Sequence, residues 1–241
     1  DLFSVEERKD GWVRGMAMKD AYKGWIEETQ LAPYPPLNKG DSARHYVAVR
    51  SAWGYEAPDL KSQPLIDLHM TSTVFVTGKS SGWIEFVFKD RRAYLPVAHC
   101  KPSRKLFDTP PDAARAFLGT PYVWAGNTGF GLDCSGLVQV ALRACHVHCR
   151  ADSHQQEEHT KGQRLADEEL LQAGDLVFWK GHVAMATGPG TIIHANAHHM
   201  AVVEEPAAEA IERIAAKEGK PVTSRIRPDL SVGFPSEGPE T

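Results

Sequence analysis

The chain has 241 residues, of which 42% are hydrophobic, and a formal net charge of -4 at pH 7. This length and composition are typical of a soluble globular protein with one large domain or two to three small ones. The densest basic run, over residues 101–105, holds three charges, which excludes a basic stripe that follows a nucleic-acid backbone. No run of 18 apolar residues offers a membrane span.

The cysteine content gives a first indication of the compartment. The chain has four cysteines, which are too few for a disulfide scaffold of this length: Cys100, Cys134, Cys145 and Cys149. They favour a reducing compartment, and residues 1–3 lack the basic and apolar segments of a signal peptide. We therefore expect a cytoplasmic protein, with a periplasmic or secreted location as the alternative.

The first hundred residues carry the pattern of short antiparallel strands. Apolar and polar residues alternate over residues 73–76 and 83–88, and turn-forming residues occupy 78–82 and 89–90. The segment that begins at Gly11 can be aligned with the segment that begins at Gly82, because Gly-Trp, Lys-Asp and an aromatic strand recur in order. This weak repeat predicts two copies of a small all-β barrel.

The two predicted copies are unequal. The first, over residues 1–34, has too few residues before its Gly-Trp pair to supply every strand, so we expect an incomplete barrel. Three prolines within residues 32–38 cannot join a central strand and predict a linker. The second barrel is expected over residues 42–101, and another linker follows over about 101–108.

The pattern changes to helices followed by strands from Thr109 onward. Thr109 and Pro110 predict a helix start, which leads to a short helix ending at Gly119. A second helix is expected to begin at or near Cys134, and Ser153 with Gln156 forms a capping-box pattern for a third. Strands are then predicted over 175–179, 182–187, 191–195, 201–203 and 222–226, with a helix over about 207–217. The sequence thus predicts an α+β domain over 105–229 and a C-terminal tail over 230–241.

Cys134 is the candidate nucleophile. A free thiol is mostly protonated at neutral pH, and a helix N-terminus and a nearby histidine both favour its thiolate. His182 begins a strand after a glycine, and His194 lies twelve residues later on the next strand. A hairpin of that length can place the imidazoles side by side, with one acting as a base and the other orienting it. Each residue alone is more typical of a buried structural side chain, so the hypothesis rests on the combination.

Four motifs in a fixed order make the hypothesis specific. They are PYVWAGNTGFGLDCSGLVQ from Pro121, AGDLVFW from Ala173, GHVAM from Gly181 and IIHANAHHMAV from Ile192. Together they resemble the NlpC/p60 family of papain-like cell-wall hydrolases over about residues 105–229. The resemblance implies Cys134 as nucleophile, His182 as base and His194 as orienting residue, with no cofactor and no metal.

The two barrels are similar to the bacterial SH3-like domains of a subgroup that acts on peptides with a free N-terminus. In that subgroup, residues matching Tyr122, Asp133, Ser135 and Ser153 shape the subsite for L-Ala-γ-D-Glu. The first barrel also contributes acidic and tyrosyl side chains, for which Glu6, Glu7 and Tyr22 are the candidates here. The resemblance does not explain His198 and His199, which we interpret as solvated turn residues.

Residues 145–149, Cys-His-Val-His-Cys, are the other candidate cluster. One short cluster without a second ligand pair is poor metal spacing, so a helix end with packed thiols is favoured over a zinc site.

These observations favour a γ-D-glutamyl-L-diamino acid endopeptidase of the dipeptidyl-peptidase VI type, acting on peptidoglycan stem peptides. The alternatives are an inactive cell-wall peptide-binding protein, and an amidase or acyltransferase that uses the same Cys-His-His set. The sequence leaves open the choice between Lys and meso-diaminopimelate, a role in recycling or in wall trimming, and the oligomeric state.

Overall fold

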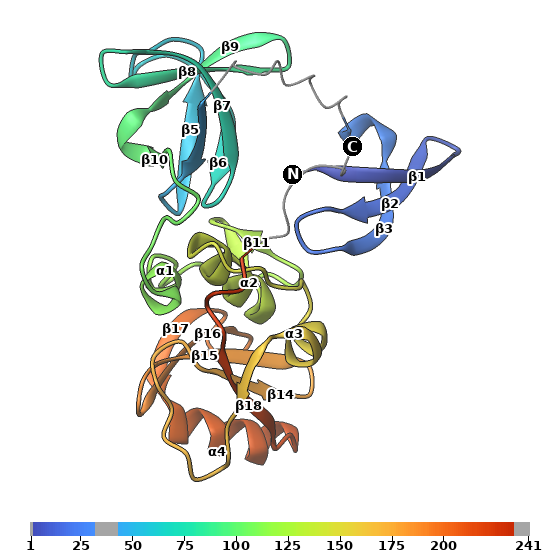
Figure 1. Cartoon of the computed structure of the whole chain (residues 1–241), viewed down its shortest axis with the longest axis vertical. Helices are drawn as coiled ribbons and strands as arrows, with labels where there is room; N and C mark the ends of the chain where they lie inside the picture. Colours follow the sequence, from blue (N-terminus) through green and yellow to red (C-terminus); the bar gives the residue numbers. More distant parts are fainter. Residues whose placement is uncertain (1, 32–42, 234–241) are drawn as a thin grey trace.

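The computed structural model describes residues 2–31 and 43–233. These residues form a three-stranded sheet, a seven-stranded sheet and an α+β unit with a six-stranded sheet. In Figure 1 the seven-stranded sheet lies above the α+β unit, and the three-stranded sheet lies beside them. No helix among the described residues is long and apolar enough to cross a membrane. The predicted linker over residues 32–38 and most of the predicted tail lie outside the described residues.

The three-stranded sheet holds very little apolar core of its own. Its antiparallel strands are β1 (Phe3–Lys9), β2 (Trp12–Ala17) and β3 (Tyr22–Glu27), and a short 3-10 turn, η1 (Glu28–Gln30), follows. Val13 is the one buried apolar side chain within residues 2–31. Because a small sheet with so little buried surface is marginal on its own, it depends on contact with a neighbouring unit.

Asp20, in the turn between β2 and β3, supplies that contact. It is 2% exposed, and its Oδ2 accepts a hydrogen bond of 3.1 Å from Gln139 Nε2 in the α+β unit. Its carbonyl oxygen accepts a second bond of 2.9 Å from Arg150 Nη1. Its Oδ1 accepts the Tyr22 N–H, which shapes the turn. The tip of the β2–β3 hairpin is therefore docked onto the α+β unit through buried polar bonds.

The seven-stranded sheet curls around a single core. Its strands are β4 (Ala43–Val47), β5 (Ser51–Tyr55), β6 (Pro64–His69), β7 (Thr73–Ser80), β8 (Trp83–Phe88), β9 (Arg91–Pro96) and β10 (Cys100–Lys101), with the 3-10 turn η2 (Val97–His99) before β10. They are ordered β10-β4-β7-β8-β9-β5-β6. Every strand contributes at least one side chain to one cluster, including Ile84 and Leu95, which are fully buried. The hairpins predicted around residues 73–88 are confirmed.

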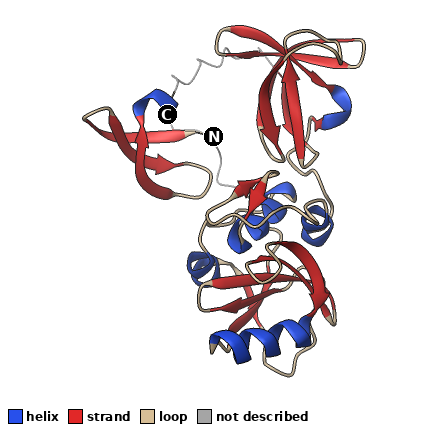
Figure 2. Cartoon of the chain, turned by 180° about the vertical axis from the view of Figure 1, so that it is seen from behind, coloured by secondary structure: helices blue, strands red, loops and turns tan. Residues whose placement is uncertain are grey.

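The α+β unit places its sheet between two helices. Its elements are α1 (Pro110–Arg115), β11 (Asn127–Thr128), β12 (Gly131–Leu132), α2 (Cys134–Ala144), α3 (Ser153–His159), β13 (Gly162–Arg164), β14 (Leu176–Trp179), β15 (His182–Gly188), β16 (Thr191–Asn196), β17 (Ala201–Pro206), α4 (Ala207–Glu218) and β18 (Val222–Pro228). The six-stranded sheet has the order β13-β18-β14-β15-β16-β17. Val183 and Met185 pack with α2 on one face, and Ala184 and Ala186 pack with α4 on the other. Figure 2 shows the same arrangement from behind.

Several local predictions need correction. Thr109 caps α1 as expected, but α1 ends at Arg115, and the chain reaches Gly119 through turns. The predicted capping box at Ser153 is wrong: Asp152 is the N-cap residue without a side-chain cap bond, and Ser153 is the first helical residue. Gln156 is fully buried and donates instead to the carbonyl oxygen of Ser135 at 2.9 Å. A buried side-chain amide must form hydrogen bonds, and Gln156 forms its bond between α3 and the start of α2 instead of at the cap of α3.

Asp20→Asn tests the docking of the three-stranded sheet. The Asn amide group would oppose the donor of Gln139, so we expect a loss of about 1–3 kcal/mol in the free energy of unfolding. Urea denaturation of the full chain measures it. Asp10→Asn, in the exposed turn between β1 and β2, is the matched control and should change stability by less than about 0.5 kcal/mol. Equal stability of the two variants would contradict the docking role of Asp20.

Candidate active site

The start of α2 is fixed by the carboxylate of Asp133. Its Oδ1 accepts the Gly136 N–H at 2.7 Å and the Ser135 hydroxyl at 3.0 Å, and its Oδ2 accepts the Ala125 N–H at 3.0 Å. This is the N-cap arrangement, extended to the preceding loop. Gly136 is required here because a Cβ atom would lie 2.2 Å from the carbonyl oxygen of Gly126. The loop and the helix start are thus held together as one rigid corner.

Cys134 is the first residue of α2, as the sequence predicts, and is 8% exposed. Backbone N–H groups of Val183, Ser135 and Cys134 itself are directed at its sulfur. Burial and the neighbouring Asp133 charge outweigh them and raise the pKa of Cys134 to about 11. The helix N-terminus, which is one of the two groups expected to favour the thiolate, does not suffice by itself. The thiol needs a base to lose its proton at neutral pH.

His182 and His194 are brought together as predicted. His182 Nε2 lies 2.8 Å from His194 Nδ1, and both residues lie on the face of the sheet that α4 covers. The Val183 N–H directed at the Cys134 sulfur places the beginning of β15 against the thiol. Burial, followed by the nearby positive groups, lowers the pKa of His182 to about 3. A neutral imidazole is the form that can accept a proton.

Glu205 and Arg213 extend this arrangement, and no motif in the sequence points to either residue. Glu205 Oε1 lies 2.6 Å from His194 Nε2. Arg213 in α4 donates two hydrogen bonds of 2.6 Å to Glu205, one to each carboxylate oxygen. The predicted strand ended at residue 203, whereas β17 runs to Pro206, so Glu205 lies within the sheet. Side chains in a strand alternate between the two faces of the sheet, so extending the predicted strand by two residues would have placed Glu205 on the same face as Val203.

The predicted substrate-binding residues gather around the start of α2. Tyr122 pairs with Leu132 just before the cap residue, and burial, with the nearby charges of Cys134 and Asp133, raises its pKa. Ser135 is buried and donates to Asp133. Ser153 is half-buried at the start of α3, which Gln156 ties to the Ser135 carbonyl.

The three-stranded sheet reaches the same region through Tyr22. The charge of Asp152 and a hydrogen bond from the Tyr22 side chain to that carboxylate raise the pKa of Tyr22. Asp152 is the residue before Ser153, so the first unit lies next to the candidate subsite. Glu6 and Glu7 are exposed, and Glu6 pairs with Lys23 at 3.4 Å. Of the three candidates from the first unit, Tyr22 has the contact with the α+β unit.

Two histidines beyond His194 occupy a turn. His199 donates its N–H to Asn196 Oδ1 at 2.8 Å, and its Nδ1 lies 3.9 Å from Glu205 Oε1. The ring of His198 contacts that of His199 with 4.6 Å between centroids. His198 and His199 are both exposed, as predicted, and the His199 side chain lies near Glu205.

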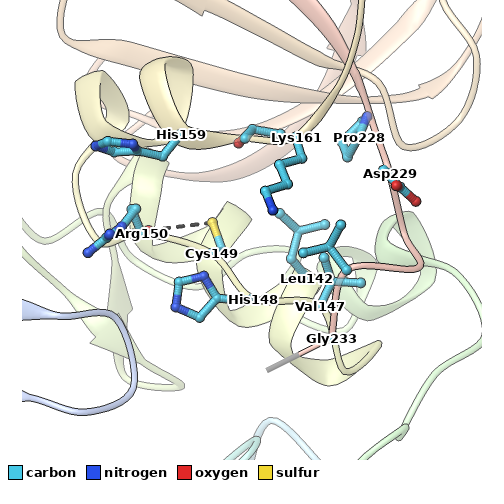
Figure 3. Close-up of a pocket in the computed structure, with 12 residues that line it drawn as sticks. Leu142, Val147, His148, Cys149, Arg150, His159, Lys161, Pro228, Asp229 and Gly233 are labelled. Carbon is cyan, nitrogen blue, oxygen red and sulfur yellow. Dashed lines mark hydrogen bonds between the residues drawn. The ribbon is translucent and has the colours of Figure 1, made fainter. Parts of the chain in front are cut away.

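A cavity of about 410 Å³ has a lining that does not include Cys134. It is lined by residues at the C-terminal end of α2 and by the segment after it, including Cys149, Arg150 and Lys161 (Figure 3). Burial raises the pKa of Cys145 to about 11 and that of Cys149 to about 12, so both are protonated thiols. Within the described ranges, no group of three or more His, Cys, Asp or Glu side chains is arranged to hold a metal ion.

Comparison with known proteins identifies this arrangement. Residues 119–215 match the model of the NlpC/P60 family. Over 207 residues the chain is 35% identical to dipeptidyl-peptidase 6 from Lysinibacillus sphaericus. The aligned region covers 80% of this chain and 75% of that protein. The chain belongs to the NlpC/P60 family. Members of this family are cysteine peptidases, which agrees with a Cys at a helix start beside a histidine pair.

Two further relatives cover most of the chain. A γ-D-glutamyl-L-lysine dipeptidyl-peptidase from Bacillus cereus is 28% identical over 214 residues, or 79% of this chain and 63% of that protein. The chain thus spans less than two thirds of that relative's length. The crystal structure of an NlpC/P60 family protein from Bacillus cereus superposes with a TM-score of 0.76 at 25% identity. The superposition covers 97% of this chain and 79% of that one. The α+β fold of this NlpC/P60 chain is confirmed by that structure.

His182→Ala tests whether Cys134 depends on the histidine. Because its pKa is raised to about 11, Cys134 without a base should be almost fully protonated at pH 7. We expect its alkylation by iodoacetamide at pH 7 to slow at least about tenfold and to recover only at alkaline pH. Mass spectrometry of the peptide that contains Cys134 measures the rate. His198→Ala is the control and should react like the wild type; an equal rate in His182→Ala would argue against the pairing.

Proposed function

We propose that the protein is a cysteine endopeptidase that hydrolyses the γ-D-glutamyl-L-diamino acid bond of peptidoglycan-derived peptides. The diamino acid is L-Lys or meso-diaminopimelate, and the substrate carries a free N-terminal L-Ala. The name of the Bacillus cereus relative, a γ-D-glutamyl-L-lysine dipeptidyl-peptidase, supports this bond, and the Lysinibacillus relative is also named a dipeptidyl-peptidase. The observation that carries the proposal is the Val183 N–H directed at the Cys134 sulfur, next to the bonded His182–His194 pair.

The chemistry follows from these positions. His182 removes the proton of the Cys134 thiol, and the sulfur attacks the carbonyl carbon on the γ-carboxyl of D-Glu. The N–H groups at the start of α2 stabilise the negative oxygen of the tetrahedral intermediate. His182 then returns the proton to the leaving amine of the diamino acid. Water, activated by the same histidine, hydrolyses the thioester and releases the γ-linked dipeptide.

A charged subsite accounts for the proposed requirement for a free N-terminus. An ammonium group prefers a carboxylate partner. Oδ2 of Asp133 accepts a single protein N–H in the structure, so it keeps a lone pair for a substrate donor. Tyr122, Ser135 and Ser153 surround this corner. Tyr22 and Asp152 close it from the side of the three-stranded sheet.

The proposal extends to the domain folds and to the location of the protein. We take the α+β unit to be a papain-like catalytic domain. The two preceding sheets are taken as SH3-like domains, the first incomplete, which narrow access to the subsite. The free, buried cysteines of the described residues are compatible with a cytoplasmic location and a role in recycling wall peptides.

Blocking the substrate amine tests the bond and the end requirement together. We expect L-Ala-γ-D-Glu-L-Lys to be cleaved to L-Ala-γ-D-Glu and L-Lys. Its N-acetyl derivative should lose at least about 100-fold in kcat/KM, because acetylation removes the ammonium charge that would pair with the Asp133 carboxylate. Chromatography of the products measures both. Cys134→Ala should be inactive. Equal cleavage of both peptides would overturn the free-amine requirement, and release of a different fragment would favour an amidase.

Tyr22→Phe tests the contribution of the first unit. The change keeps the ring and removes the hydroxyl that contacts Asp152. We expect kcat/KM for the free peptide to fall about five- to tenfold, mainly through KM, as for loss of one hydrogen bond to a charged group. Tyr55→Phe, in the seven-stranded sheet, is the control. Unchanged kinetics in Tyr22→Phe would remove the three-stranded sheet from the subsite.

A further inference from the structure

We propose that the Glu205–Arg213 ion pair is a positioning unit of the active site that sets the tautomers of both histidines and so leaves Nδ1 of His182 as the base. The inference rests on the proposed peptidase function, and it adds two residues beyond the Cys-His-His set. Glu205 comes from β17 and Arg213 from α4.

The first step is that Glu205 is an ionised carboxylate. Its side chain is 11% exposed, and Arg213 binds both of its oxygens at 2.6 Å. Burial opposes the charge, but the hydrogen bonds from His194 and Arg213 and their positive charge hold the pKa of Glu205 well below its usual range. An ionised carboxylate only accepts hydrogen bonds.

The ionised carboxylate of Glu205 fixes the tautomer of His194, and His194 in turn fixes that of His182. Since Glu205 accepts, His194 must carry its proton on Nε2, and its Nδ1 is then an acceptor in the neutral ring. His182 must therefore donate its own Nε2–H to His194 Nδ1 at 2.8 Å. Neutral His182 is left with a lone pair on Nδ1, the nitrogen free to take the thiol proton. Fixing a tautomer through a second hydrogen bond is the usual role of such partners.

The geometry follows from the strand registers. His194 faces Val203 across β16 and β17, so Glu205, two residues on, is its diagonal neighbour on the same face. The pairing of Met185 with Ile193 puts His182 on that face as well. Three successive strands thus carry His182, His194 and Glu205 in a diagonal line. Helix α4 covers this face and delivers Arg213 at the end of the line.

The pair also sets the charge around the base. The groups that face Glu205 are His194, Arg213 and His199, and the positive groups near His182 include Lys220 and Arg213. Glu205 is the negative group that opposes the lowering of the His182 pKa. Its removal therefore weakens the base and destabilises the protonated imidazole that forms when the thiol loses its proton.

A neighbouring ion pair provides a matched control. Glu204 precedes Glu205 on β17 and pairs with Arg115 at 3.1 Å, on the opposite face of the sheet. In Glu205→Gln we expect kcat to fall at least tenfold with KM within twofold, and alkylation of Cys134 at pH 7 to slow at least fivefold. Glu204→Gln should match the wild type in both measurements. Unchanged kcat and alkylation in Glu205→Gln would overturn the proposal.

A second pair of variants covers the case in which Glu205→Gln does not fold. The double variant Glu205→Leu/Arg213→Leu removes both charges of the ion pair together. Replacing a whole buried ion pair by apolar residues often leaves a protein folded. This double variant should lose activity like Glu205→Gln. The control double variant Glu204→Leu/Arg115→Leu should keep wild-type activity. Retained activity in the first double variant would also overturn the proposal.

The tautomers themselves can be read in the wild-type chain. With ¹⁵N-labelled histidine, long-range ¹H–¹⁵N spectra at pH 7 should show a protonated Nε2 and an unprotonated Nδ1 in both His182 and His194. A protonated Nδ1 in neutral His194 would contradict the inference. Neither the spectra nor the alkylation rates need a peptide substrate. If the wild type fails to cleave the peptide but Glu205→Gln still slows alkylation, the proposed function fails and the positioning role stands.

Discussion

The site depends on the hydrogen bonds that the Asp133 carboxylate accepts at the start of α2. The carboxylate binds the N–H groups of Gly136 and Ala125 and the hydroxyl of Ser135, so one side chain joins the loop, the helix start and a subsite residue. This holds Cys134 at a fixed place against the beginning of β15. The same negative charge also raises the pKa of the thiol. Asp133 therefore makes the corner rigid and at the same time disfavours the Cys134 thiolate, which in the proposed mechanism leaves the thiol dependent on His182.

On the opposite side of the site, the histidine pair and Glu205 are held deep in the sheet. His194 is 1% exposed, and behind it Glu205 is held by two bonds from Arg213. Trp179 lies against His182 with 5.4 Å between ring centroids, which limits water around the base. Strands fix backbone positions more firmly than loops do. His182 is the first residue of its strand and is backed by two further strands and a helix, so it has little freedom to leave its position.

The three-stranded sheet connects substrate selection to the stability of the fold. With one buried apolar side chain, it relies on Asp20 and its bonds to Gln139 and Arg150. The same hairpin carries Tyr22 to Asp152, next to Ser153. Asp20 and Tyr22 are two residues apart, so under the proposed function a change that loosens the docking at Asp20 would also disturb the subsite.

Much of the local structure was determined by the sequence alone. The alternation around Trp83, the cap at Thr109 and the helix start at Cys134 are local patterns whose causes lie within a few residues, and the structure bears them out. The pairing of His182 with His194 was also accessible, because a short hairpin limits where two strand residues can lie.

The surroundings of these groups depend on packing between segments that are distant in the sequence. Glu205 belongs to the site because β17 continues for two more residues and α4 brings Arg213 to it. Gln156 reaches Ser135 instead of capping its own helix. The pKa of Cys134 is raised because burial, which no residue pattern measures, outweighs the helix start. Residue types and spacing fix the candidates, whereas burial and long-range partners, set by packing between distant segments, fix their protonation and roles.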